Sequence, residues 1–189
     1  ITFSFVYSDR LKAKGDTYLS CLIMNRYRFA LLSQILIFLI PLNLYMWGDG
    51  LIVNAQWALF RYQQSGFGNS LIIGYKDIVY ISLGLTTGMY TVAAALFWTV
   101  GAAVLFIGLC ITIFAVIKDD AGFIKTASYF TLFGGFLCIV SAMCRFFGGF
   151  SLPLGVPVIL YSGWRMYQDN NEEVEYEDVP DEDDVSSPE

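Results

Sequence analysis

The sequence predicts an all-α membrane protein: a four-helix transmembrane bundle with a structured outer loop and a disordered acidic C-terminal tail. Of its 189 residues, 56% are apolar and 17% aromatic, and the mean hydropathy of +0.57 is too high for an ordinary soluble domain. Four long runs without charge supply the spans. Residues 1–168 hold all 11 Lys and Arg against six acids, whereas residues 169–189 hold 11 acids alone. The net charge of -6 therefore describes a basic membrane body with an acidic tail.

The first predicted span covers residues 29–47, an uncharged run of 19 residues that is close to the ~20 needed to cross a hydrocarbon core of about 30 Å. Pro41 is expected to kink this helix, and Tyr45 and Trp47 are expected to lie at the membrane interface. The second span lies within an uncharged run from about residue 83 to residue 117. This run is longer than the bilayer is thick, so its first turn or two is expected to stand outside.

The third predicted span covers about residues 127–144, and the fourth covers about residues 150–164. A loop of about nine residues, 118–126, is short enough to make the second and third spans an antiparallel hairpin. In the fourth span, Pro153, Gly155 and Pro157 predict an outer half that is bent or locally unwound.

The distribution of basic residues predicts the orientation in a cell membrane. With the N-terminus inside, eight of the 11 Lys and Arg are cytoplasmic and three are outside, which places both termini of this multi-pass protein in the cytoplasm. The expected divisions are a cytoplasmic segment 1–28, a membrane domain 29–167 with an outer loop 48–82, and an acidic tail 168–189. Met24 begins a short basic leader that is typical of a natural start, so residues 1–23 are hypothesised to lie upstream of it; a genuine cytoplasmic arm is the alternative.

The outer loop 48–82 is too long and too apolar to be a passive connection. Residues 65–70, SGFGNS, form a turn signal between two runs rich in Ile, Val, Tyr, Phe and Trp, which favours a hairpin with Gly74 as a bulge. An interfacial helix over residues 51–64 is the alternative. The aromatic side chains of the loop either bind a partner or pack on the bundle and anchor it at the interface: Trp57, Phe60, Tyr62, Tyr75 and Tyr80.

Small residues at four-residue spacing are candidate helix contacts, because membrane helices associate where their backbones can approach closely. They support packing within the chain as well as a homo-oligomer. The candidates are Gly84 and Gly88 at the start of the second span, Ala95, Thr99 and Ala103 deeper in it, and Gly134, Cys138 and Ala142 on the third.

Arg145 lies at the outer edge of the third span and has two interpretations. Its side chain either snorkels to the interface or enters a cavity formed by the fourth span, near Pro153 and Pro157. In the second case it is a candidate anion or lipid site, or it pairs with Asp49 or Asp77.

The composition also argues against several kinds of chemistry. The chain has no histidine, which removes bis-His haem ligation, His-based metal sites and the commonest general base. Its four cysteines have no CxxC spacing, and the spans hold no ionisable residue at mid-membrane depth. We therefore expect no catalytic residue, metal or cofactor and no nucleic-acid partner. The expected partners are the lipid bilayer and either another protein or a second copy of the chain.

The layout of four spans, a large first outer loop and a short second one resembles the claudin-type tetraspan plan, and Trp47 and Trp57 resemble that family's loop tryptophans. The paired loop cysteines of the family are absent, so the resemblance implies an architecture and no function. The sequence favours a non-enzymatic scaffold, sealing or accessory subunit of a membrane complex that acts through its outer aromatic loop. The alternative is a small-solute or lipid transporter or channel subunit.

Overall fold

The structure is a computed structural model that describes residues 27–47 and 52–177, with side chains described as far as residue 169. This part of the chain is mostly helical and also contains a five-stranded antiparallel sheet, which the prediction of an all-α fold missed. In chain order, the elements are a helix Tyr27–Leu39, β1 (Asn43–Trp47), β2 (Ile52–Gln56), β3 (Phe60–Ser65), β4 (Gly68–Ile73), α2 (Gly74–Ser82), α3 (Met89–Lys118), α4 (Ala121–Phe146), β5 (Phe150–Leu152) and α5 (Val156–Glu177).

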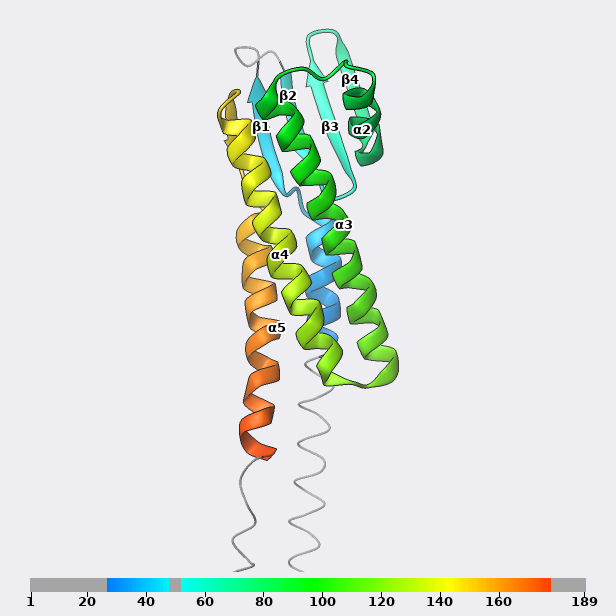
Figure 1. The fold of residues 1–189 in the computed structure, drawn as a ribbon, viewed down its shortest axis with the longest axis vertical. Coiled ribbons are helices and arrows are strands. Elements are labelled where there is room, and N and C mark those ends of the chain that lie inside the picture. The colour runs from blue at the N-terminus through cyan, green and yellow to red at the C-terminus, as the bar shows by residue number, and fades with distance from the viewer. Residues whose placement is uncertain (1–26, 48–51, 178–189) are drawn as a thin grey trace, which may run out of the picture.

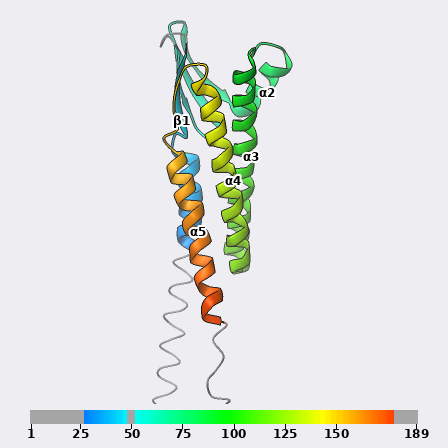
Figure 2. The same cartoon turned by 60° about the vertical axis from the view of Figure 1, so that its left-hand side comes forward.

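The long helices lie side by side, and the sheet and α2 sit at one end of them, called here the sheet end (Figures 1 and 2). Two of the helices, α3 and α4, are long and apolar enough to cross a membrane. The helix Tyr27–Leu39 is apolar but shorter, and the second half of α5 is rich in acidic residues. Side chains from the helix Tyr27–Leu39, α3, α4 and α5 share two buried clusters along the bundle.

Buried residues on α3 recur at alternating spacings of four and three, the pattern of helices that cross at a small angle. A Cβ at Gly101 would lie 3.2 Å from Leu137 Cβ, and one at Gly134 would lie 2.8 Å from Leu105 Cγ, so α3 and α4 approach closely here. The repeating residues are Ala94, Trp98, Gly101, Leu105, Gly108, Thr112 and Ala115.

Only Asp119 and Asp120 separate α3 from α4. Asp119 ends α3 in the left-handed conformation, with φ 54°, and the Asp120 side chain caps α4 by accepting a hydrogen bond from the Gly122 backbone N–H at 2.8 Å. The connection is shorter than the nine residues expected, and the two helices form the predicted antiparallel hairpin.

The small residues predicted to pack fall into two groups. On α4, Gly134, Cys138 and Ala142 are all buried, whereas on α3 Ala95 is buried, Thr99 half-buried and Ala103 exposed. Gly84 and Gly88 precede α3 and have positive φ angles of 68° and 93°, so they serve the turn into the helix and do not lie on a helix face.

Two predicted spans contain strand where helix was expected. The first helix ends at Leu39, before Pro41, and the residues that follow form β1. In the fourth, residues 150–152 form β5, and α5 begins at Val156 with Pro157 in its first turn, where a proline is tolerated. The cause is backbone pairing: Leu42 N–H donates to Gln56 C=O, and Gly155 N–H donates to Leu42 C=O.

The acidic segment differs from its prediction where it is described. Helix α5 continues to Glu177, so the first part of the tail 168–189 is helical and not disordered, and the remainder lies outside the described residues. The N-terminal arm and the hypothesis about Met24 also lie outside them.

The sheet has the order β4-β3-β2-β1-β5 with every neighbouring pair antiparallel. The hairpin predicted at residues 65–70 is confirmed by the pairing of Ser65 with Gly68, and the alternative of an interfacial helix is wrong. Gly74 begins α2 and is not a bulge. Strand β5 comes from the second loop and pairs with β1 through Tyr45 and Ser151, so the two loops form one sheet.

The polarity of the two sheet faces is the reverse of that usually seen on a core, where the inward face is apolar. The face toward the helices carries the apolar Trp47, Ile52 and Ile72, but most of its buried side chains are polar: Asn43, Tyr45, Asn54, Gln56, Arg61 and Ser151. The face away from the helices, called here the outward face, also carries the polar Gln64 and Asn69 near the β3–β4 turn, but most of its exposed side chains are apolar: Met46, Val53, Tyr62, Leu71, Phe150 and Leu152.

We predict that Gly149→Ala destabilises the protein more than Gly66→Ala does. A Cβ at Gly149 would lie 2.3 Å from the backbone oxygen of Met46, which cannot move without disturbing the β1–β5 pair. We expect a loss of at least about 2 kcal/mol in the free energy of unfolding. At Gly66 nothing lies within 4 Å, so the same substitution should change it little. Equilibrium unfolding of the purified variants checks this, and equal stabilities would contradict it.

Candidate functional site

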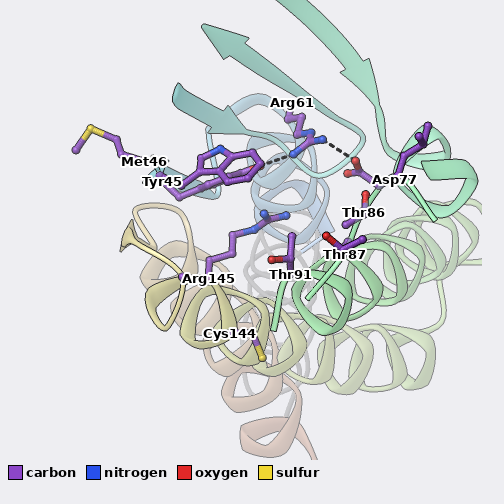
Figure 3. A pocket seen from close by; sticks show the side chains of 13 residues that line it. Tyr45, Met46, Arg61, Asp77, Thr86, Thr87, Thr91, Cys144 and Arg145 are labelled. Atoms are coloured by element: carbon purple, nitrogen blue, oxygen red, sulfur yellow. Dashed lines mark hydrogen bonds and ion pairs between the residues drawn. The ribbon is translucent and has the colours of Figure 1, made fainter. Parts of the chain in front are cut away.

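A cavity of about 180 Å³, lined by both charged and apolar side chains, lies at the sheet end, between the inward face of the sheet, the start of α3 and the end of α4 (Figure 3). Its charged and hydroxyl side chains come from several elements of the fold. They are Tyr45 on β1, Arg61 on β3, Asp77 on α2, Thr86 and Thr87 in the α2–α3 connection, Thr91 on α3 and Arg145 on α4.

Arg61 joins the sheet to α2. Strand alternation directs its side chain inward, where one guanidinium nitrogen donates to Tyr45 Oη at 2.6 Å and the other to Asp77 Oδ1 at 2.7 Å. Asp77 is held opposite because α2 starts directly after β4 and carries the aspartate in its first turn, where the helix dipole favours a negative charge. The ion pair is largely shielded from solvent, with side-chain exposures of 12% and 5%.

Arg145 enters the cavity from the last turn of α4 and points toward the space between Arg61 and the threonines (Figure 3). Its guanidinium carbon lies 4.0 Å from the centre of the Tyr45 ring, a cation–π contact that also directs the side chain inward. Its Nε and Nη2 atoms are buried and have no hydrogen-bond partner within the described part of the chain. Among the described residues, two guanidinium groups and one carboxylate line the cavity.

Burial dominates the protonation of Asp77. Desolvation raises the pKa of its carboxyl above the ordinary value of 3.8, and the positive charges of Arg61 and Arg145 oppose this only in part. The second carboxyl oxygen, Oδ2, is buried without a hydrogen-bond partner among the described residues, which is consistent with a desolvated group.

The structure places Arg145 in a cavity, as one of its two interpretations expected, but the walls differ from the expected ones. Pro153 follows β5 and Pro157 lies in the first turn of α5, and neither residue lines the cavity. Asp77 does line it, but its ion pair is with Arg61. Asp49 lies outside the described residues. Sequence reasoning missed Arg61, which the alternation of a correctly assigned β3 would have placed on the inward face.

The five loop aromatics do not form one surface. Trp57 holds the sheet to the helices: its indole N–H donates to Leu39 C=O at 3.0 Å, and its own C=O accepts from the Trp98 indole at 3.1 Å. Phe60 stacks on Trp57 at 5.0 Å. Tyr62 lies on the outward face, whereas Tyr75 and Tyr80 belong to α2.

A second hollow, about 410 Å³ in volume, is almost wholly apolar and lies where the sheet, α2 and α3 meet. Thr99 and Ala103, which were predicted to contact another helix, line this groove instead, together with Tyr75 and Trp98. Within the described residues, no three Cys, Asp or Glu side chains are placed to hold a metal ion.

We predict that the stability of the wild-type protein, relative to Asp77→Asn, decreases as the pH rises above about 4. The folded state raises the pKa of Asp77 above 3.8, so it binds this proton more tightly than the unfolded chain does. The associated stability is complete below pH 3.8 and is lost as the pH rises through the raised pKa, and the amide lacks this dependence. Thermal unfolding of both proteins between about pH 4 and pH 8 measures the difference, and parallel curves would rule out the raised pKa.

The chain matches no protein-family model, and a comparison with curated proteins finds no significant match. Its function is therefore argued from the physical properties of its surfaces and cavities.

Proposed function

We propose that this chain is a four-span membrane protein that acts as a scaffold or accessory subunit of a membrane complex and contacts a protein partner through the outward face of its sheet. The bundle is the anchor, and the sheet stands on the outer side of a cell membrane. The observation that carries the proposal is the reversed polarity of the sheet, with apolar side chains away from the bundle.

The surface of α3 supports placement in a bilayer. Its exposed side chains are as apolar as its buried ones, which is typical of a helix surrounded by hydrocarbon. They include Leu96, Phe97, Val100, Phe106, Ile107, Ile113, Phe114 and Val116.

Polar side chains inside the bundle support the same placement, since membrane helices use them for contacts with one another. Ser141 on α4 donates to the Ala94 carbonyl of α3 at 2.7 Å, and Gln34 donates to Thr131 between the first helix and α4. Such bonds orient helices whose apolar side chains give little preference for protein over lipid.

The two remaining spans in this proposal are the helix that contains Tyr27–Leu39, which shares buried clusters with α3, α4 and α5, and the first half of α5, which runs beside α4 (Figure 2). Basic residues support the orientation. Arg28, Lys118, Lys125 and Arg165 lie toward the end of the bundle opposite the sheet, and the positive-inside rule makes that end cytoplasmic.

The outward face supports a binding role because its exposed apolar side chains lie next to one another on adjacent strands. Paired residues on adjacent strands, such as Tyr62 with Leu71 and Met46 with both Val53 and Phe150, make the apolar surface continuous across the sheet. Contiguous exposed apolar surface rimmed by polar residues marks interaction sites in proteins. A partner of matching chemistry presents an apolar surface at the same height above the membrane.

We predict that Leu71→Glu abolishes binding of the partner without unfolding the chain. Leu71 is 60% exposed on the outward face, and burying a carboxylate in an apolar interface without a counter-charge costs several kcal/mol. The matched control is Leu83→Glu, at a leucine that is 65% exposed at the end of α2, outside the sheet.

The measurement is copurification from native membranes, with a photo-crosslinker at Tyr62 to identify what touches the face. The crosslinked mass distinguishes a second copy from a different protein. A monomer crosslinked to nothing at this position, or equal copurification of the two Glu variants, would refute the proposed contact.

We also predict that an epitope inserted at Gly66–Phe67 is accessible on intact cells, whereas one inserted between Asp119 and Asp120 requires permeabilised cells. The first site is the exposed turn between β3 and β4, and the second is the connection between α3 and α4. Antibody labelling before and after permeabilisation measures this. Labelling of the second epitope on intact cells would contradict the proposed orientation.

A further inference from the structure

The unpaired edge of Arg145 has the geometry of an oxyanion ligand. Nε and Nη2 are the two nitrogens on the same edge of a guanidinium group, where their N–H bonds point in nearly the same direction and can hold two oxygens of one anion. Both atoms are buried and lack partners among the described residues. The side chain points into the cavity shown in Figure 3, so a ligand held there lies next to this guanidinium group.

The charge in the cavity also favours an anion. Arg145 remains charged at any physiological pH, and the nearby carboxylate of Asp77 already accepts a hydrogen bond from Arg61. The three groups together carry one excess positive charge. A buried cation without an anionic partner is unfavourable, so an anion that pairs with Arg145 stabilises the folded protein.

Neutral donors surround the same space. The hydroxyls of Thr86, Thr87 and Thr91 line the cavity, and α3 begins between them at Met89. The N-cap of this helix is Gly88, which provides no side-chain acceptor for the first-turn N–H groups. A carboxylate offers two oxygens to these donors, whereas a phosphoryl group offers oxygens in a tetrahedral arrangement that can reach both Arg145 and the threonines.

We propose that this cavity binds a phosphoryl group, with the Nε–Nη2 edge of Arg145 as its principal contact and threonine hydroxyls as further donors. The group belongs to a membrane lipid headgroup or to a free phosphate compound. The volume of about 180 Å³ exceeds the roughly 150 Å³ cavity that accepts benzene, so a phosphoryl group with a short substituent fits. This inference does not depend on the partner-binding role proposed for the outward face.

The test uses the full chain in two arms that distinguish the sources. In the first, detergent-solubilised, delipidated protein is examined by native mass spectrometry with phosphatidic acid, and with a diacylglycerol of the same acyl chains that lacks the phosphoryl group. In the second, protein in phosphatidylcholine nanodiscs is titrated with inorganic phosphate, and binding is followed by calorimetry and by the fluorescence of Trp47, which lines the cavity.

We expect wild-type protein to bind the phosphoryl ligand in at least one arm and to prefer phosphatidic acid to diacylglycerol if the source is a lipid. Arg145→Gln should weaken this binding by about tenfold or more, since it removes a charge-assisted bidentate contact. Arg145→Lys keeps the charge but loses the fork, so its affinity should fall between the two. The matched control is Arg165→Gln, at a half-exposed arginine that pairs with Asp169 on α5, which should bind within about twofold of wild type.

Three outcomes would overturn the proposal: absence of binding in both arms, equal retention of diacylglycerol and phosphatidic acid without phosphate binding, or unchanged affinity of Arg145→Gln. Near-ultraviolet circular dichroism and size exclusion establish that each variant is folded. If Arg145→Gln fails to fold, Arg145→Lys and Thr91→Val decide, because the valine keeps the shape of the side chain and removes only its hydroxyl. Wild-type affinity in both of these folded variants would equally overturn the assignment.

Discussion

The arrangement of the elements at the sheet end depends on the hydrogen bonds of one buried group, the guanidinium of Arg61. It donates to Tyr45 on β1 and to Asp77 on α2, so one side chain on β3 joins two further elements through their side chains. Removing either charge would leave the other buried without its partner, which typically costs about 3–5 kcal/mol, whereas the intact pair contributes much less because both groups were desolvated to form it. Its structural effect is to fix α2 against the sheet, which forms one wall of the cavity that Arg145 enters from the opposite side.

This ion pair belongs to a wider polar layer between the sheet and the helices. Ser151 donates to Asn43 across the β1–β5 pair, while both side-chain polar atoms of Asn54 and the amide nitrogen of Gln56 lack hydrogen-bond partners among the described residues. Buried polar groups normally have partners, and ordered water supplies them where protein atoms do not. We therefore expect water or a ligand in the layer between the sheet and the helices. The outward face of the same sheet is then left with the apolar side chains.

Much of the bundle could be predicted from the sequence, because long uncharged runs and the turn at residues 65–70 are local signals. The sheet was missed where strands continue directly from apolar runs: residues 43–47 have no charge to separate them from the first helix, and only pairing with the distant β5 makes them a strand. The face of α3 that meets α4 could not be read from the sequence for a similar reason. Gly84 and Gly88 have the expected spacing, but Gly101 and Gly108 lie on the face that meets α4. Because α3 is apolar on every side, its sequence does not indicate which face packs against another helix. Arg145 could be singled out as an unusual charge, but its neighbours Arg61 and Asp77 come together only through the tertiary fold.

Strand register determines both surfaces to which a function is assigned. On β3, Arg61 points inward and Tyr62 outward, and on β1, Tyr45 and Met46 do the same. A slip of one residue would exchange these sets, bringing Tyr62 and Met46 toward the polar layer and taking Arg61 away from Asp77. The slip is opposed at both ends of the sheet, by the tight turn at Gly66–Phe67 and by the approach of Gly149 and Gly155 to the backbone of residues 41–47, where no larger side chain fits. By opposing this slip, Gly149 and Gly155 help to keep Arg61 in the cavity and to keep the apolar side chains together on the outward face.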